Sequence, residues 1–588
     1  MPHQLFFPRR PVRDVGEGGI QVPDRAQDAG VELPDPEPLP WRMSPPPIPQ
    51  TLLDRHGARV LRPAEAARRG GYERIEPTVY RTGSLLVANA LAEGGALDRL
   101  NGQLSDLRVR LVRPKPLAEV IPDADRDFFA DLPRSVSLVP AGDEAVVVDA
   151  WTVLQRLRSV ARDRPDEDSR AAETAAEDGD AAAADGGNPP PAPIYSDEVR
   201  RIGLEHLLLG SALSGVGTLG GENSPTNGSP AVNNPSGPAR YDMTGRLPLR
   251  SAPAPRPPRT PENGRRPVVA VLDTGYYRHP WFTEAERTDA EQDPALLARV
   301  SVIVDSQWQE QILDGGRDDQ NRHRPDRTLV EGYCDEPPVL EPLGGELATH
   351  FGHGTFIAGL IRQIVPDAVV FVIRVMQPDG VAYEADVLFA LGLIARQAAR
   401  YANGEDVLPI DVVSLSAGYF PETPEERLTA DMFRVAIDKL RDLGVTMVAA
   451  AGNYASSNEF QPAALADPGS RVKAPCLSVG ALNPNGTIAS FSNQAKWVTC
   501  YASGVAVVSS FPPVDGSTNP TWAVPRYGRQ SYDLDDFSSG IALWNGTSFA
   551  TPIIAAAIAA QLARGGLAPG DGAGMPARAN EAMDKLRE

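Results

Sequence analysis

The chain is poor in cysteine and has fewer basic than acidic residues. Its 588 residues include 3 cysteines, whose number and spacing fit neither a disulfide framework nor a zinc site, so we expect buried reduced thiols. Lys and Arg number 57 against 77 Asp and Glu, which gives a net charge of −20. This balance argues against nucleic acid as a partner, because phosphate binding needs a basic surface. It also gives no reason to expect binding to an anionic membrane.

Long apolar runs are missing as well. No stretch approaches the roughly 20 apolar residues of a membrane span. The beginning of the chain, MPHQLFFPRRPVRDVGEGG, has no apolar core of the kind that a signal peptide needs. We therefore expect a cytoplasmic protein that does not bind membranes. Because 42% of its residues are hydrophobic, the chain can bury at least one sizeable core, and its length suggests more than one folded part.

The part of the chain before residue 266 combines linkers with one small domain. Residues 1–70 are rich in Pro, Arg and acidic residues and are expected to lack a core of their own. Short strand patterns and helical patterns at 72–161 predict a small α+β domain. Residues 162–265 are low-complexity linkers, interrupted by an amphipathic island at 196–213. We interpret His206 in this island as an ordinary, partly buried histidine.

Residues 266–566 show a different pattern, in which strands alternate with helices. The runs VVAVLD, VVFVIRV and VVSLS are continuous and rich in β-branched residues, as expected for strands buried on both faces. Helical patterns lie between such runs at 385–402 and 424–444. This alternation predicts an α/β fold with a parallel sheet flanked by helices, in which a site forms beyond the carboxyl ends of the strands. Residues 567–588 are expected to form a C-terminal tail.

Asp273 ends the first of these strands, in the sequence VLDTG. Asp-Thr-Gly occurs in proteases whose two aspartates share a proton and in proteases whose single aspartate orients a histidine. It also occurs at simple turns after buried strands. The two-aspartate chemistry needs a second such motif or a homodimer. The chain contains one Asp-Thr-Gly and no Asp-Ser-Gly, and its α/β pattern also argues against that class.

Three further segments carry residues suited to nucleophilic catalysis. His353, in HFGHGTFIAG, precedes a helical pattern of small residues, whereas His350 lacks the Gly-Thr that follows His353. Ser548, in NGTSFATP, opens a helical pattern, where unpaired N–H groups and the helix dipole favour developing negative charge. Asn453 follows a strand in AAAGN, and its amide can donate to an oxyanion. By itself, Gly-Asn after a strand is more typical of a turn.

In this order, VLDTG, HGTFIAG, AAAGN and NGTSFATP resemble the signature segments of the subtilisin-like serine protease family, peptidase S8. The resemblance covers about 265–565 and implies a subtilisin-like α/β fold. It implies that Asp273 orients His353 and that His353 acts as the general base toward Ser548. Ser548 would then form an acyl-enzyme, and Asn453 would hold the oxyanion.

The segment SLSAGYF adds a further correspondence with the family. Ser416, Ala417 and Gly418 match the segment that lines the primary specificity pocket and pairs with the substrate backbone as an added strand. The pocket floor is expected around YASSNEFQPAA. We expect no metal and no cofactor, because no oxygen-rich loop of this chain matches the calcium ligands of relatives.

The resemblance implies a serine endopeptidase that acts on a peptide or protein substrate. Because no signal peptide is recognised, we expect it to act inside the cell, regulated or targeted by its N-terminal region. Three roles remain open for the N-terminal region: an inhibitory prodomain, a sensor or docking module for a partner or activator protein, and an inert scaffold. The alternative function is a catalytically silent binding protein that retains a protease-like domain. We also expect self-cleavage within PAPRPPRTPENGRR, at 253–266, just ahead of the protease part.

Overall fold

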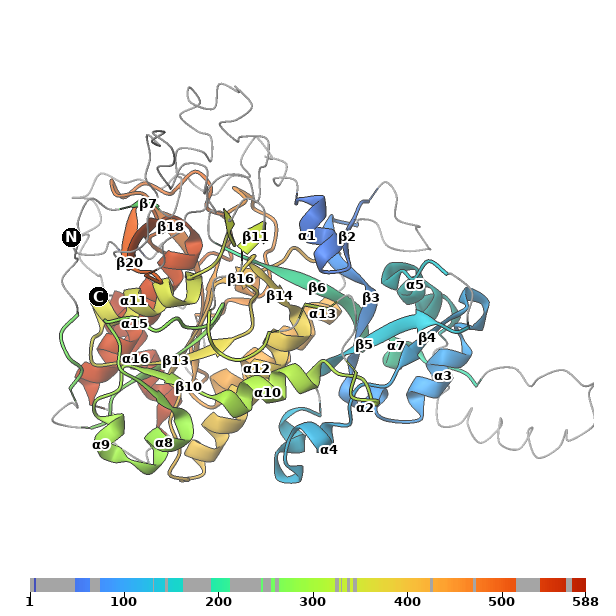
Figure 1. Cartoon of the computed structure of the whole chain (residues 1–588), viewed down its shortest axis with the longest axis horizontal. Coiled ribbons are helices and arrows are strands. Elements are labelled where there is room, and N and C mark those ends of the chain that lie inside the picture. The colour runs from blue at the N-terminus through green and yellow to red at the C-terminus, as the bar shows by residue number, and fades with distance from the viewer. Residues whose placement is uncertain are drawn as a thin grey trace, which may run out of the picture.

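The chain folds into a smaller N-terminal part and a larger C-terminal part that lie side by side (Figure 1). The computed structural model describes residues 5–6, 48–63, 75–130, 132–142, 146–161, 192–211, 245–246, 255–259, 264–322, 327–328, 330–335, 339–341, 346–422, 427–468, 472–513, 540–566 and 574–587. Most of the residues that we expected to be linkers, in 1–70 and 162–265, lie outside this set.

A parallel sheet forms the centre of the C-terminal part. Its strand order is β1-β19-β18-β17-β15-β8-β13-β10-β9, and β1 alone pairs antiparallel within it. The strands are β1 (Leu5–Phe6), β8 (Val268–Asp273), β9 (Glu284–Glu286), β10 (Val302–Val304), β13 (Val369–Arg374), β15 (Val412–Leu415), β17 (Thr446–Ala450), β18 (Cys476–Leu482) and β19 (Cys500–Ser503). The central strands β8, β13 and β15 are buried at every position, as their β-branched sequences predict.

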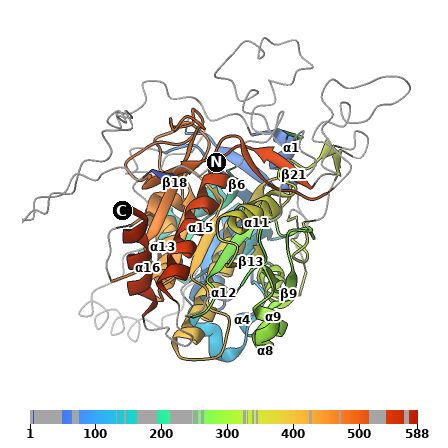
Figure 2. The ribbon, with the colours of Figure 1, turned by 90° about the vertical axis from the view of Figure 1, so that its left-hand side faces the viewer.

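Helices cover both faces of this sheet and close two hydrophobic cores (Figure 2). Side chains of β8 alternate between the cores: Ala270 and Leu272 lie in one, and Val269 and Val271 lie in the other. One face carries α10 (Ser306–Gly315), α12 (Glu384–Ala402) and α13 (Arg427–Asp442); the other carries α11 (His353–Ile364), α15 (Thr547–Gly565) and α16 (Met575–Arg587). No helix in the described part of the chain combines the length and hydrophobicity needed to cross a membrane.

Two expectations are corrected by this part of the structure. The tail expected at 567–588 contains α16, which packs on α15 and places Met583 in a core. Among the cysteines, Cys476 and Cys500 are buried free thiols as expected, whereas Cys334 is only half-buried.

The N-terminal part is the α+β unit that the sequence predicts, but it extends beyond 72–161 at both ends. It takes in residues 48–63, and its sheet runs β6-β3-β5-β4, with β2 at the side of β3. Its main elements are α1 (Gln50–Arg55), β2 (Ala58–Leu61), β3 (Thr78–Ala88), α3 (Ala96–Gly102), β4 (Val109–Val112), β5 (Pro133–Pro140), α5 (Ala150–Val160), α7 (Ser196–Val199) and β6 (Ile202–Gly210).

Strand β6 connects the two parts. Its first half pairs antiparallel with β3, and its second half enters the C-terminal part between β14 (Val381–Tyr383) and β16 (Ala417–Gly418) (Figure 1). All nine residues of β6 are buried. The described residues 196–211 of the island expected at 196–213 are therefore not an amphipathic island within a linker, because partners cover β6 along its whole length.

His206, near the middle of β6, carries a buried positive charge. Its Nδ1 lies 2.7 Å from Glu384 Oε2, and its Nε2 lies 2.8 Å from Glu422 Oε2. Burial acts to lower the pKa of His206, but the two carboxylates outweigh burial and raise the pKa to about 10. The ring also stacks on Tyr419 at 4.2 Å between centroids. His206 is thus fully buried and ionised, rather than partly buried as we expected.

Replacement of His206 by Gln should lower the free energy of unfolding by about 3–5 kcal/mol, because Glu384 and Glu422 would lie buried without a cation. Since the folded pKa of about 10 exceeds the ordinary 6.5, this contribution should be complete below pH 6.5 and should fade as the pH rises to 10. Urea unfolding of both proteins at neutral and alkaline pH measures the difference.

The matched control is Arg278→Gln, which breaks a pair with Glu284 in which the arginine side chain is 85% exposed. This change should leave the unfolding free energy nearly unchanged. Equal changes of the unfolding free energy in the two variants would contradict a stabilising role for the buried pairs of His206 with Glu384 and Glu422.

Candidate active site

The carboxyl edge of the parallel sheet holds the residues that the sequence singles out. Asp273 is the last residue of β8, Ser416 directly follows β15, and Asn453 lies in the loop after β17. His353 and Ser548 lie in the first turns of α11 and α15. This is the edge at which sites form in parallel α/β sheets.

Asp273 and His353 form a buried hydrogen-bonded pair. His353 Nδ1 lies 2.7 Å from Asp273 Oδ1, and the Thr274 N–H donates to the same oxygen at 2.8 Å. The start of α11 can lie this close to the end of β8 because residue 354 is glycine. A β-carbon at position 354 would lie 2.2 Å from the Gly275 oxygen. His353 Nε2 is buried and has no hydrogen-bonding partner among the described residues, so it can serve as a base.

The Ser548 hydroxyl is directed at the strand edge that contains Ser416 and makes no hydrogen bond with His353 Nε2 in this structure. Its Oγ is 3.4 Å from the Ser416 carbonyl oxygen, and Ser416 Oγ donates to the Ser548 carbonyl at 3.1 Å. Phe549, the next residue, packs against the His353 ring with centroids 5.3 Å apart. The helix start and the histidine are thereby held together.

Two donors converge on the carbonyl oxygen of Ser211, the residue that follows β6. The Ser548 N–H donates to it at 3.0 Å, and Asn453 Nδ2 donates to it at 2.5 Å. The Asn453 amide is held in place by the Thr547 N–H and hydroxyl, which donate to its Oδ1 at 2.9 and 2.8 Å. Donors arranged in this way would stabilise an oxyanion formed on that carbonyl.

The backbone before Ser211 is bound as an added strand. The Ser211 N–H donates to the Ser416 carbonyl at 2.8 Å, and the Gly210 N–H donates to the Gly380 carbonyl at 2.7 Å. Leu209 pairs with Val381 of β14 on one side. On the other side, Leu209 pairs with Gly418 of β16. The strand that pairs along 416–418 in this structure is therefore β6 of the chain itself, and a role of this segment in binding other substrates stays a prediction.

Phe460 fills the space beside this strand. A β-carbon at Gly418 would lie 2.4 Å from Phe460 Cε1, and one at Gly452 would lie 3.0 Å from Phe460 Cδ1. Phe460 is almost fully buried and lies within 454–464, the segment in which we expected the pocket floor.

Asp335 is a buried residue near the site that sequence reasoning missed. Its Oδ2 accepts hydrogen bonds from the Thr274 hydroxyl and the Gly352 N–H, both at 2.8 Å. The same hydroxyl accepts from the Gly354 N–H at 2.9 Å, so Asp335 connects the end of β8 to the start of α11. Burial raises the pKa of Asp335 to about 7.

The chain is similar in sequence to one protein family and to individual serine proteases. The model of the subtilase family matches residues 264–566. Subtilisin BL of Lederbergia lenta is 29% identical over 217 residues, which cover 35% of this chain and 62% of that protein. A cuticle-degrading serine protease of Arthrobotrys oligospora is 30% identical over 171 residues, which cover 28% of this chain and 36% of the relative. The match thus spans less than two thirds of the length of either relative.

The solved structures that match this chain include a lanthipeptide protease and a cold-adapted subtilisin-like serine proteinase. Their sequence identities are 19% and 18%, and the matches cover 50% and 57% of this chain. These matches cover 73% and 87% of the two solved chains, each with a TM-score of 0.30.

Replacement of Asp335 by Asn should change the pH dependence of stability. Because the folded pKa of about 7 lies above the ordinary 3.8, the protonated carboxyl contributes stability that is complete below pH 3.8 and is lost as the pH rises through 7. The introduced amide would keep the hydrogen-bond acceptor and would not titrate. The melting temperature of the wild type should therefore fall relative to that of the variant between about pH 4 and about pH 7. Parallel curves would contradict this assignment.

Proposed function

Since the chain belongs to the subtilase family, we propose that it is a serine endopeptidase whose active site is occupied by its own N-terminal part and that cuts its own chain after Ser211. The observation that carries this proposal is the position of the Ser211 carbonyl. Its oxygen accepts hydrogen bonds from the Ser548 N–H and from Asn453 Nδ2, the two groups expected to hold an oxyanion.

The first chemical step of this proposal is attack by Ser548. His353 Nε2 takes the proton of the Ser548 hydroxyl, while Asp273 accepts the Nδ1 proton and stabilises the imidazolium. Ser548 Oγ bonds to the Ser211 carbonyl carbon, and the negative charge forms on the oxygen that Asn453 and the Ser548 N–H already contact. The oxyanion donors are in place before the charge forms. The Ser548 hydroxyl, which donates to the Ser416 carbonyl at 3.4 Å, must first turn toward His353 Nε2.

The second step releases the new amino terminus. His353 returns the proton to the nitrogen of Ala212, the Ser211–Ala212 bond breaks, and Ser548 holds Ser211 as an acyl ester. A water molecule, deprotonated by His353, then attacks the ester and frees a Ser211 carboxylate. The same residues would cut other peptides or proteins once β6 has left the cleft.

Strand β6 would inhibit the enzyme after this cut as well as before it. It fills the substrate edge between β14 and β16, and the buried pairs of His206 with Glu384 and Glu422 do not involve the broken bond. Among the three roles open for the N-terminal part, this geometry supports the inhibitory prodomain. A partner protein that acts through this part, and a cytoplasmic setting, rest on the sequence alone and stay predictions.

The proposed cut after Ser211 differs from the self-cleavage that we expected within 253–266. In that segment, Arg256 pairs with Asp367 and Arg265 pairs with Asp411. Asp411 directly precedes β15, and Asp367 lies two residues before β13, so these arginines lie at the amino edge of the sheet. The active-site residues lie at the opposite, carboxyl edge.

A fluorophosphonate probe tests this function against the alternative of a catalytically silent binding protein. Intact-mass analysis of the wild type should show two fragments, one ending at Ser211 and one beginning at Ala212. After chromatographic removal of the first fragment, the second should carry one probe adduct. Ser548→Ala should remain a single, unlabelled chain. A wild type that stays uncut and unlabelled would favour the silent binding protein.

Replacement of Asn453 by Ala should slow self-cleavage by about 10²–10³-fold, because one of the two oxyanion donors would be lost. The rate of appearance of the Ala212 amino terminus measures this effect. Asn458→Ala is the matched control, since Asn458 is an exposed residue of the same loop, and it should leave the rate unchanged. An unchanged rate in Asn453→Ala would remove the amide from the proposed oxyanion site.

A further inference from the structure

Gly210, the residue before Ser211, lies against the ring of His350. A β-carbon at position 210 would lie 2.8 Å from both Cδ2 and Nε2 of His350, closer than two such atoms can approach. The Gly210 N–H donates to the Gly380 carbonyl, so the backbone of residue 210 cannot move away without losing a hydrogen bond of the added strand. The main obstacle is therefore the histidine ring, because the next nearest atom, the Gly380 carbonyl oxygen, would lie 3.3 Å from that β-carbon.

The His350 ring is confined on its other sides. A β-carbon at Gly380 would lie 2.3 Å from His350 Nδ1, so that glycine packs directly behind the ring. The His353 ring lies 5.4 Å away between centroids, and His350 is 3% exposed. Rotation of the ring away from residue 210 would bring it against one of these neighbours.

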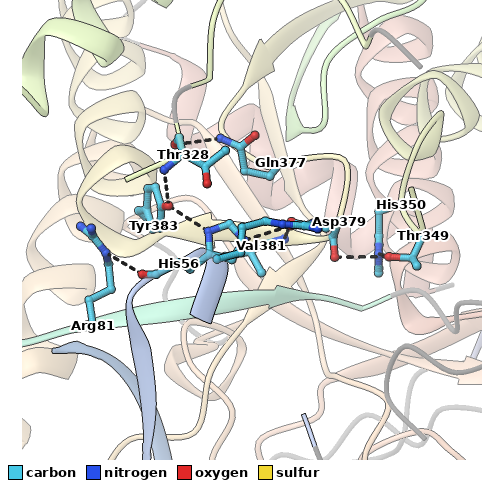
Figure 3. Close-up of polar contacts among 10 residues, drawn as sticks. His56, Arg81, Thr328, Thr349, His350, Gln377, Asp379, Val381 and Tyr383 are labelled. Atoms are coloured by element: carbon cyan, nitrogen blue, oxygen red, sulfur yellow. Dashed lines mark hydrogen bonds and ion pairs between the residues drawn. The ribbon is translucent and has the colours of Figure 1, made fainter. Parts of the chain in front are cut away.

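Hydrogen bonds hold the same ring from the side of the loop that contains Asp379 (Figure 3). The Thr349 hydroxyl lies 3.2 Å from His350 Nδ1 and donates to the Asp379 carbonyl at 3.3 Å. The Asp379 side chain in turn lies 3.0 Å from His56 Nε2, and His56 Nδ1 lies 2.9 Å from the Tyr383 hydroxyl. Asp379, which lies behind Thr349 and the ring, is therefore in contact with His56 of the N-terminal part.

His350 acts here through its shape rather than through charge. Burial and the neighbouring His353 lower the pKa of His350 to about 3, so the ring is neutral at physiological pH. No role for this ring in proton transfer is needed, because His353 is the residue paired with Asp273. A neutral, immobile ring at this position limits the size of the residue opposite it.

We propose that His350 makes the enzyme select glycine as the second residue before the bond that it cuts, in its own chain at Gly210 and in other substrates. This inference rests on the proposed function, because it assigns a substrate preference to the same site. The substrate class is a peptide or protein segment in which glycine precedes the residue at the cut, bound as an added strand between β14 and β16.

Self-cleavage of the full chain tests this selection. Gly210→Ala should slow the cut after Ser211 by about 10- to 200-fold, the range for one methyl group in a closed subsite. In a His350→Ala background, the same Gly210→Ala change should alter the rate by only about threefold, because the 3.3 Å contact of the β-carbon with the Gly380 oxygen would remain but the contacts with the ring would be gone. The ratio of the two effects is the readout, since it cancels any direct effect of His350→Ala on the neighbouring His353. His350→Ser provides a second small side chain if the alanine variant folds poorly.

Gly142→Ala is the matched control, because a β-carbon at position 142 meets no atom within 4 Å. It should leave self-cleavage unchanged. The selection would be overturned if Gly210→Ala were cut at the wild-type rate, or if its effect were the same in both backgrounds, while the fluorophosphonate probe still labelled Ser548. A wild type that is neither cut nor labelled would instead overturn the proposed function, and the inference with it.

Discussion

The hydrogen bonds of one buried strand are the constraint on which the arrangement of the whole molecule depends. Every residue of β6 is buried, so its backbone donors and acceptors need partners within the protein. The strand β3 supplies them for its first half, and β14 and β16 supply them for its second half. Because these partners belong to different parts of the chain, the pairing fixes how the two parts are placed. It also determines which peptide bond lies at Ser548.

Buried charges give this pairing its register. Glu205 is paired with Arg81, and the next residue, His206, is paired with Glu384 and Glu422. A slip of β6 by one residue would turn each of its side chains to the opposite face of the sheet and would separate these charges from their partners. Buried charges without partners are strongly destabilising, whereas a slip that moved only leucine side chains would leave no charge unpaired. The ionic contacts in the middle of the strand thus fix the position of the Ser211 carbonyl at its end.

The sequence predicts the C-terminal fold well, because its signals are local. The runs VVAVLD and VVFVIR indicate strands covered on both faces, and the motif around each candidate residue indicates the end of a strand or the start of a helix. The structure brings Asp273 and His353 together in the way that the motifs suggest. Their catalytic roles stay a prediction.

Other features depend on contacts between residues distant in the sequence. The segment LEHLLLGS suggests an amphipathic element, because its charged residues look exposed when their partners are not known. Those partners lie 124, 178 and 216 residues away. Asp335 contacts Thr274 across 61 residues and is part of no recognisable motif. No local pattern could reveal such pairs, so the sequence left the role of the N-terminal part open.

Because β6 and the cleft that it fills belong to one chain, occupancy of the cleft does not depend on protein concentration while the chain is intact. A cut after Ser211 turns this internal contact into an association of two molecules. From then on, the fraction of occupied clefts depends on how much of the N-terminal fragment is present, because the high effective concentration of a tethered strand is gone. Dilution, or destruction of the fragment, would then free the cleft with no change in the C-terminal part.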